Sequence, residues 1–396
     1  MEKRQTVNPV AEPRRCTRCV LPENFRNIRF DADGVCNYCR NHDKYIGFFR
    51  RYALAEEMFL KQVQANRGKY RYDCAAGLSG GKDSCYVLYQ LVKKYKLNVL
   101  AITTDNGWLE ERARENIKKV VSDLGIDHVM LQLDQAQQCR LYKAAGIQCG
   151  WPCIACSFLG IAQVQRYCFD HKIPFCVHGR ARSQMLRELS RYSHDSYLPY
   201  YGMIYRPYDF SAVMRSVRAG RKQLEMIIGR LIPDERERQE FIQRHVVDPA
   251  ACEREQFAPQ FVAYFLMEDY NRKKVLEFME STVLGNQKMA KPDHSDCRAS
   301  EVFMHIYKQA FGWSLLELEI AFDVRDGKIS REEALERIRN EKAAFELPKE
   351  SFDLVCAKLG ADQQELLDGL DIARKNIKKY QRIKKIRNFF IPAFRV

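Results

Sequence analysis

Apolar residues along this chain gather in two patterns that predict strands and helices. Short, almost uninterrupted apolar runs have the length of strands that are buried on both faces. The predicted strands are 72–78, 98–103, 128–133 and 174–178. Apolar residues at helical spacing occur between and before these runs, most clearly at 109–124 and 158–171. Strands and helices that alternate in this way predict an α/β fold with a doubly wound, parallel sheet.

The remainder of the chain is predicted to be mainly helical. A cysteine-rich segment precedes the α/β pattern, and a helical region dense in arginine follows it. Further on, Ser330 and Glu333 have the spacing of a capping box at the start of a helix. The predicted divisions are a cysteine module at 1–45, a helical connector at 46–71, an α/β domain at 72–185, an arginine-rich helical region at 186–300 and a C-terminal helical region at 301–396.

Composition and charge narrow the class of protein. The chain has 396 residues, 46% of them hydrophobic, which excludes global disorder. No window reaches the roughly 18 consecutive apolar residues of a membrane span, and the N-terminal segment has no apolar leader, so we expect a cytoplasmic protein. The formal net charge of +14 suits a nucleic acid or a phosphorylated substrate as partner. The 15 cysteines are expected to be thiols and metal ligands.

Four cysteines near the N-terminus have the spacing of a structural zinc site. Cys16 and Cys19 form one C-x2-C pair, and Cys36 and Cys39 form a second pair 16 residues further on. Asp33-Gly34 lies between two short extended runs and predicts the turn that brings the pairs together. Four thiolates fill the tetrahedral coordination of Zn²⁺, so the metal would stabilise the fold. Iron bound by the same ligands is the alternative.

The sequence SGGKDS, Ser79 to Ser84, follows the first predicted strand and precedes a helical pattern. Gly80 and Gly81 let the backbone approach phosphate oxygens, and the free N–H groups of a helix start point at them. Lys82 adds a cation, while Ser79 and Ser84 supply hydroxyl groups. Asp83 is a candidate ligand of Mg²⁺. The motif differs from the loop of γ-phosphate-transferring enzymes.

Other candidates lie where predicted strands end. Ligands of parallel α/β sheets bind at the carboxyl ends of the strands, so Ser79, Asp105 and Gly179 are expected to face one cleft. Asp105 is a candidate for nucleotide or magnesium contacts, but a turn-forming role is equally compatible with the Asn-Gly that follows it. Arg180 and Arg182 come just after the fourth strand and are the first candidates for substrate binding.

A second cysteine pair, Cys153 and Cys156, lies at a predicted helix start close to this cleft. Such a pair can bind a metal or an iron–sulfur cluster, act as a reactive thiol pair with a lowered pKa, or pack as small apolar groups. Cys297 is the first choice for a distant third ligand, with Cys149 and Cys252 behind it. Three cysteines would leave one iron of a [4Fe–4S] cluster open for an external sulfide.

The loop resembles the signature of the PP-loop ATP pyrophosphatases, which implies cleavage of ATP to AMP and pyrophosphate through an adenylated substrate. The stretch from Cys16 to Tyr45, the SGGKDS loop and GKISREEALERI at 327–338 together resemble the N-acetyl sugar amidotransferases of surface-polysaccharide and nonulosonic acid biosynthesis. This resemblance implies a nucleotide-linked N-acetyl sugar as substrate, ammonia from a glutaminase subunit as partner, and ATP, Mg²⁺ and Zn²⁺ as cofactors.

The pair Cys153 and Cys156 departs from that family and is similar to cluster-dependent enzymes that insert sulfur into transfer RNA. The alternative is therefore an ATP-dependent sulfurtransferase with a [4Fe–4S] cluster on Cys153, Cys156 and Cys297, and with RNA as a possible substrate. A third hypothesis is a non-catalytic RNA-binding scaffold. A basic amphipathic segment at 373–390 suits RNA or an anionic surface, but a packed terminal helix is favoured.

Overall fold

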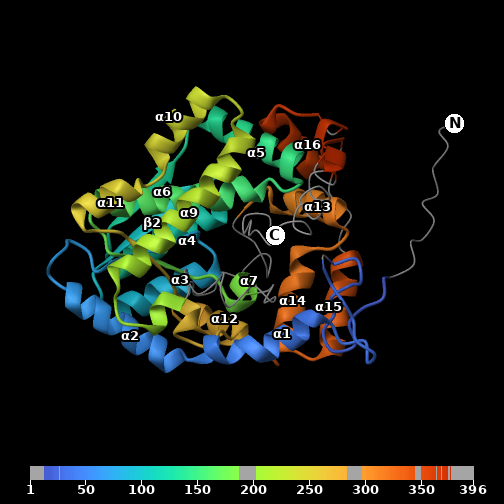
Figure 1. The fold of residues 1–396 in the computed structure, drawn as a ribbon, viewed down its shortest axis with the longest axis horizontal. Coiled ribbons are helices and arrows are strands. Elements are labelled where there is room, and N and C mark those ends of the chain that lie inside the picture. Colours follow the sequence, from blue (N-terminus) through green and yellow to red (C-terminus); the bar gives the residue numbers. More distant parts are fainter. Residues whose placement is uncertain are drawn as a thin grey trace.

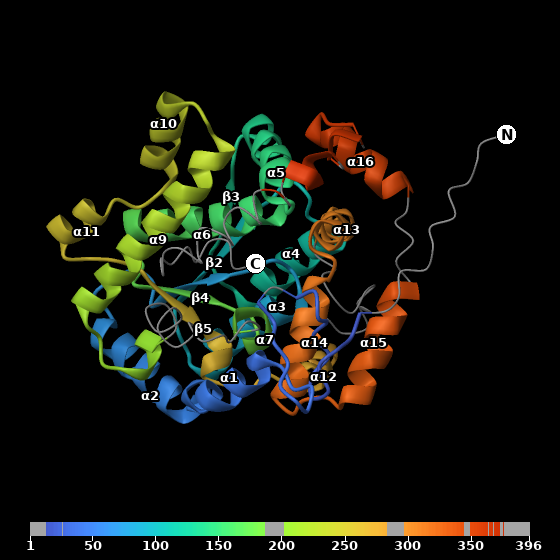
Figure 2. The same ribbon diagram turned by 45° about the vertical axis from the view of Figure 1, so that its right-hand side comes forward.

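The computed structural model describes residues 13–186, 202–282, 297–343, 349–372 and 375, apart from residues 26, 363 and 367. Its centre is a parallel sheet of five strands in the order β3-β2-β1-β4-β5 (Figures 1 and 2). The strands are β1 (Cys74–Gly77), β2 (Val99–Asp105), β3 (His128–Gln132), β4 (Phe175–His178) and β5 (Gln260–Ala263). The order reverses at β1, so the sheet is doubly wound as predicted.

Each face of the sheet packs against its own helices, which gives three layers. Side chains of Cys74, Val99 and Phe175 point to the face covered by α2, α3, α4 and α12. Ala75 and Leu100 point to the opposite face, where α6 packs. The helices before and within the sheet are α1 (Asn37–Tyr45), η1 (Ile46–Arg50), α2 (Tyr52–Asn66), α3 (Lys82–Tyr89), η2 (Gln90–Lys94), α4 (Glu111–Leu124), α5 (Gln135–Cys149), α6 (Cys153–Asp170) and α7 (Arg182–Leu186).

The second half of the chain adds helices around this sheet. They are η3 (Gly202–Tyr205), α9 (Phe210–Leu231), α10 (Glu235–His245), α11 (Pro249–Glu255), η4 (Tyr264–Leu266), α12 (Arg272–Ser281), α13 (Ser300–Phe311), α14 (Leu315–Arg325), α15 (Arg331–Ala343) and α16 (Lys349–Leu359). The Ser330 hydroxyl accepts from the Glu333 N–H at 3.0 Å, so half of the predicted capping box is formed.

The four predicted strands are confirmed, and a fifth strand was missed. β5 lies inside the region 186–300 that was predicted to be helical, and it pairs with β4 from Phe175 to His178. Its four residues are too few to show a period, and most of them are buried, so they lack the polar alternation of an exposed strand. The second cysteine pair does lie at a helix start, because α6 begins at Cys153.

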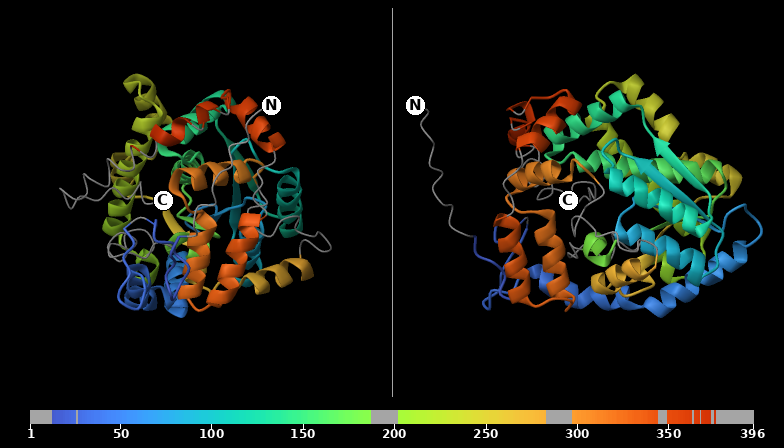
Figure 3. Two further views of the ribbon diagram at one scale, coloured as in Figure 1. Left: turned by 90° about the vertical axis from the view of Figure 1, so that its right-hand side faces the viewer. Right: turned by 180° about the vertical axis from the view of Figure 1, so that it is seen from behind.

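The N-terminal cysteine segment packs against α14 and α15, and in Figure 1 it lies on the opposite side of the molecule from α10 and α11. Figure 3 shows the same arrangement from two further directions. Its apolar residues share one core with these C-terminal helices. The predicted domain boundaries remain a prediction. Most of the basic segment 373–390 lies outside the described residues. None of the helices in the described part of the chain is long and apolar enough to cross a membrane.

Candidate functional site

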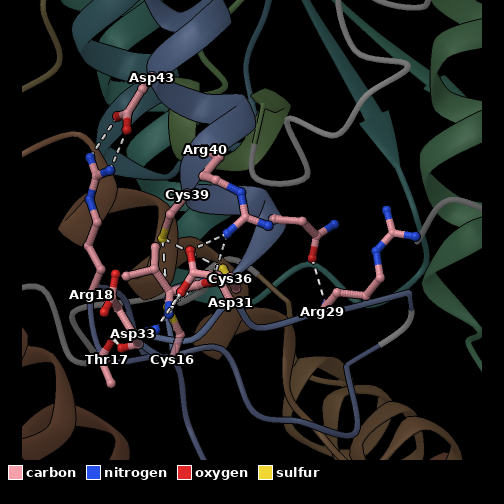
Figure 4. A network of polar contacts seen from close by, with 12 residues as sticks. Cys16, Thr17, Arg18, Arg29, Asp31, Asp33, Cys36, Cys39, Arg40 and Asp43 are labelled. Carbon is pink, nitrogen blue, oxygen red and sulfur yellow. Dashed lines mark hydrogen bonds and ion pairs between the residues drawn. The ribbon is translucent and has the colours of Figure 1, made fainter.

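The four N-terminal cysteines form one compact group, which we call the four-cysteine site. Their side chains are fully buried, and the sulfur of Cys16 lies 3.8 Å from that of Cys39. The Cys19–Cys36 and Cys36–Cys39 sulfur distances are 3.8 and 3.6 Å. Figure 4 shows the side chains of Cys16, Cys36 and Cys39 close together, with the ion pairs Arg18–Asp43 and Arg40–Asp31 nearby.

A tight turn precedes the second cysteine pair and brings it to the first. Gly34 has a φ of +75°, and the Asp31 carboxylate accepts from the N–H groups of Asp33 and Val35 at 3.1 and 2.9 Å. This turn is the one that Asp33-Gly34 predicted. The Cys36 N–H then donates to the Cys16 sulfur at 3.2 Å. Hydrogen bonds among the four thiols lower the pKa of Cys16 and raise the pKa of Cys36 and Cys39, so the four groups are electrostatically linked.

The spacing of the four sulfurs fits one tetrahedral ion. A Zn–S bond of about 2.3 Å places tetrahedral ligands about 3.8 Å apart, which the observed distances match. In a [4Fe–4S] cluster each cysteine binds a different iron, so its sulfurs lie further apart. Among the residues that the structure describes, these four cysteines alone gather closely enough for a single ion. The group therefore supports a metal centre, for which zinc remains the prediction.

Residues 79–84, the PP-loop, connect β1 to α3. Gly80 has a φ of +79°, and a Cβ built there would come within 2.3 Å of the Ala113 carbonyl oxygen, so only glycine fits. Asn116, from α4 like Ala113, donates to the Gly80 carbonyl at 2.9 Å. Among the described residues no side chain caps the start of α3. The loop is thus fixed by α4, while the first N–H groups of α3 remain suited to an anion.

The polar side chains of the PP-loop contact one another and the backbone of the loop. The Ser84 hydroxyl donates to the Gly81 carbonyl at 2.9 Å and accepts from the Ser79 N–H at 3.2 Å. Lys82 Nζ lies 3.0 Å from Asp83 Oδ2. The other oxygen, Asp83 Oδ1, is buried and has no hydrogen-bond partner within the described part of the chain. An unpartnered carboxylate oxygen beside a phosphate-binding loop fits the predicted Mg²⁺.

The structure brings the ends of β1, β2 and β4 to one edge, as predicted. A Cβ on Gly179 would lie 3.0 Å from the Asp83 carbonyl oxygen, so the end of β4 directly contacts the start of α3. Asp105 is buried, and its two oxygens accept from the Gly107 N–H at 2.8 Å and from Arg114 at 3.1 Å. These contacts support the turn-forming role of Asp105; a nucleotide contact stays a prediction.

Cys153, Cys156 and Cys297 lie together beside this edge, and we call them the three-cysteine site. Asn106, directly after β2, places its Nδ2 atom 3.8 Å from the sulfurs of both Cys156 and Cys297. Cys297 reaches this position through a backbone bridge to Leu109. Among the described residues, the three sulfurs are not grouped closely enough for a single ion. Three cysteines can each bind a different iron of a cluster, so their number is compatible with an iron–sulfur site.

Burial changes the pKa that is expected for the second cysteine pair. It raises the pKa of the Cys153 thiol well above its usual value, and neighbouring Cys156 and Cys297 add to the shift. The lowered pKa that a helix start predicts is therefore absent at Cys153, which counts against a reactive thiol pair. Burial and the same sulfurs also raise the pKa of Tyr142, whose hydroxyl donates to the Asn106 carbonyl at 3.3 Å.

The two arginines predicted to bind substrate have different surroundings. Arg180 is exposed, and its guanidinium donates to the Ser157 hydroxyl at 2.8 Å. Arg182 is 3% exposed and pairs with Asp326 at 2.8 Å and Asp269 at 2.9 Å. These ion pairs favour a structural role for Arg182. The substrate role of both residues stays a prediction.

Arginines of the region 186–300 also pair with acids. Arg215, Arg218 and Arg236 each lie within ion-pair distance of an Asp or Glu. Such pairs lower the positive charge that RNA would meet. Other polar and aromatic residues of this region lie outside the described part of the chain: Arg187, Arg191, His294 and the aromatic residues at 197–201.

Sequence reasoning missed the residues that hold the three-cysteine site in place. Asn106 follows the end of a predicted strand, and the strand-end rule that selected Asp105 applies to it equally. Lys358, from α16, donates to the Gly107 carbonyl and lies 4.3 Å from the centre of the Trp108 ring. No local signal connects residue 358 with residue 107, because only the folded chain brings them together.

Two family models match separate parts of the chain. Residues 74–146, which include the PP-loop, match the model described as queuosine biosynthesis protein QueC, a member of the PP-loop superfamily. Residues 300–391 match the C-terminal domain of LPS biosynthesis proteins that are WbpG-like. These matches support an ATP-using enzyme of the pyrophosphatase type, and they leave the choice between amidotransferase and sulfurtransferase open.

Comparisons with individual proteins give one partial sequence match and one weak structural match. The chain is 30% identical over 153 residues to the uncharacterized protein MJ1599 of Methanocaldococcus jannaschii. That match covers 38% of this chain and 53% of MJ1599, so the chain spans about half of that protein. The U34-tRNA thiolase NcsA from Methanococcus maripaludis, solved with its [4Fe–4S] cluster, is 15% identical with a TM-score of 0.29. The alignment covers 79% of this chain and 86% of NcsA, but at this TM-score it does not indicate the reaction.

The geometry of the PP-loop and the family matches indicate the same superfamily. The SGGKDS loop joins the first core strand to a helix, its glycine is required by the backbone of α4, and the sequence around it matches QueC. The predicted superfamily is confirmed by this agreement. The chain is a PP-loop superfamily protein whose C-terminal part is similar to that of WbpG-like proteins.

Proposed function

We propose that this protein is an AMP-forming amidotransferase that acts on an N-acetyl sugar. In the first step the amide oxygen of the sugar attacks the α-phosphorus of ATP, the amide loses a proton, and pyrophosphate leaves. In the second step ammonia from a glutaminase partner attacks the activated carbon, and AMP leaves with the former amide oxygen. The product is an acetamidino sugar. Adenylation is needed because the amide oxygen is otherwise a poor leaving group.

The geometry of the PP-loop is the observation that supports this proposal. The uncapped start of α3, Lys82, and the hydroxyl groups of Ser79 and Ser84 supply donors for the charge that develops on pyrophosphate. Asp83 Oδ1 is the candidate ligand for Mg²⁺. When bound, Mg²⁺ would neutralise part of the phosphate charge. The match of residues 300–391 to WbpG-like LPS biosynthesis proteins supports a surface-polysaccharide substrate.

A second candidate function is favoured by the three-cysteine site. Its sulfurs lie beside the carboxyl edge of the sheet, and Asn106 contacts two of them. A [4Fe–4S] cluster on these cysteines would supply a place for exogenous sulfide, because three cysteines leave one iron without a protein ligand. In that reaction hydrosulfide, in place of ammonia, attacks the activated carbon and AMP leaves. The adenylation step is the same.

An isotope experiment tests both steps. Nucleotide-linked N-acetyl sugars labelled with ¹⁸O in the acetamido group are incubated with ATP, Mg²⁺ and either ammonium or sulfide. We expect ¹⁸O in the AMP phosphate, pyrophosphate in equal amount, and an acetamidino product with ammonium. AMP without ¹⁸O would contradict adenylation of the amide. A thio product with sulfide alone, from anaerobically purified protein that contains iron, would replace the first candidate by the second.

A further inference from the structure

The N-terminal cysteine segment and the residues from Tyr307 to Ile338 form one core around the four-cysteine site. Phe25 packs edge-on against Trp313 with ring centroids 4.6 Å apart, and Asn24 donates to the Gly312 carbonyl at 3.2 Å. The C-terminal helices contribute buried residues to this core: Tyr307, Trp313, Leu315, Leu318, Ile320, Ala321, Ala334 and Ile338. In Figure 2 the N-terminal segment accordingly runs along α14 and α15. Neither segment could bury these side chains alone.

Arginines of the C-terminal helices satisfy polar atoms of the cysteine loops. Arg325, the last residue of α14, is 4% exposed, and its Nη1 lies 3.7 Å from the Cys19 sulfur. Arg331 donates through Nε to the carbonyl oxygens of Cys16 and Cys19, at 3.3 and 3.2 Å. In return, Arg15 of the N-terminal segment pairs with the buried Glu317 at 2.9 Å. These contacts link the two segments directly at the metal-ligand loops.

The charge of a loaded centre explains why an arginine is buried there. Four thiolates around a divalent ion carry a net negative charge, and a buried charge is stable only beside a partner of opposite sign. Arg325 lies against one of the four sulfurs. Removal of the ion takes away its positive charge and the bonds that fix the Cys19 sulfur in place, so the guanidinium no longer faces a fixed partner. Metal loading and the burial of Arg325 therefore favour each other.

We propose that the metal of the four-cysteine site docks the C-terminal helices α14 and α15 onto the N-terminal module, with Arg325 as the positioning residue that responds to the metal. The next residue, Asp326, faces the nucleotide-binding domain. Its carboxylate accepts from Arg182 and from Arg50, each at 2.8 Å. Docking therefore also supplies the buried partner of Arg182, which comes three residues after Gly179. This inference does not depend on whether nitrogen or sulfur is transferred.

Hydrogen exchange on the full chain tests the docking. The zinc-loaded protein is compared with the same protein after zinc removal by a chelator. We expect faster exchange in α14 and α15, whereas β1 and α3 keep their protection because their core is the sheet. Unchanged protection of α14 and α15 after complete zinc removal would overturn the proposal. Equal loss of protection in β1 and α3 would also overturn it, because the metal would then stabilise the whole molecule.

A pair of variants tests Arg325 itself. Arg325→Met keeps the length of the side chain without its charge, and we expect zinc transfer to a chromogenic chelator to become about 10-fold faster or more. Arg337→Met, on α15 in an exposed pair with Glu333, is the matched control and should leave the transfer rate unchanged. Arg325→Lys should recover part of the effect.

The outcomes of this comparison are distinct. Zinc transfer at the parental rate in folded Arg325→Met would exclude Arg325 as the responding residue. An equal acceleration in Arg337→Met would do the same, because the effect would then follow from any charge lost in these helices. If Arg325→Met does not yield folded protein, the exchange experiment on the parent protein decides between docking and no docking.

Discussion

The four-cysteine site and the three-cysteine site are both made of cysteines, but their geometries suit different roles. At the first, four fully buried sulfurs lie at most 3.8 Å from their nearest neighbours, and the N–H groups of Cys19 and Cys36 donate to the sulfur of Cys16. At the second, the sulfurs are further apart, and Cys156 and Cys297 are only partly buried beside Asn106. A closed set of four ligands suits a structural ion, whereas three spread ligands beside a nucleotide loop leave a position for chemistry.

The largest effect is expected from a substitution at the closed site. Cys36→Ser removes one of four ligands, and the binding free energy of a structural zinc, on the order of 10 kcal/mol, contributes to folding. We expect loss of zinc, measured by elemental analysis, and a much lower thermal transition. Cys139→Ser, a partly buried cysteine outside both sites, is the control. A folded Cys36→Ser protein with full zinc content would contradict the assignment of the structural ion to the four-cysteine site.

A substitution in the PP-loop should lower the enzymatic activity without changing either cysteine site. Lys82→Ala removes a cation aimed at the leaving phosphates, and pyrophosphate release should fall about 100-fold or more. Zinc content and thermal stability should stay at parental values. Lys119→Ala removes an exposed lysine paired with Asp123 and should change neither quantity. A small loss in Lys82→Ala would show that the loop does not stabilise pyrophosphate as proposed.

Cys156→Ser measures directly how the two sites differ. Because Cys156 is partly buried and outside the closed site, its replacement should leave folding and zinc content nearly unchanged. With ammonium as the nucleophile, turnover should also be nearly unchanged. Loss of turnover with sulfide, accompanied by loss of iron, would assign the reaction to the three-cysteine site. Loss of turnover with both nucleophiles in a folded protein would contradict the separation of adenylation from this site.

The smallest expected effect is a pH dependence of stability that arises from α14, the helix that packs on the four-cysteine site. Burial, together with Glu319 and Asp326, raises the pKa of Asp323 on α14 to about 7. The folded state therefore binds this proton more tightly than the unfolded chain, so stability falls as pH rises from about 4 to about 7. Asp323→Asn stays neutral and should melt higher than the parent protein above pH 7, with little difference near pH 4. An unchanged difference across this range would contradict the raised pKa.

The features that could be predicted from sequence are those with local causes. The two C-x2-C pairs, the turn at Asp31–Gly34 and the PP-loop each depend on residues close in the chain, and four strands were visible as apolar runs. β5 was missed because four buried residues show no period. The pairing of Phe25 with Trp313, and of Lys358 with Gly107, depends on tertiary packing alone. Cys297 could be proposed as a third ligand by chemistry, but only the bridge to Leu109 shows how it reaches Cys156.

The contact between Asn24 and Gly312 joins residues that are 288 positions apart, and this separation has a consequence for synthesis on the ribosome. At about 5–20 residues per second, the N-terminal segment emerges roughly 15–60 s before the helices that cover it. During this interval Leu21 and Phe25, which are buried in the finished protein, have no partner from that region. Early capture of the metal would keep the nascent segment compact until translation reaches Trp313.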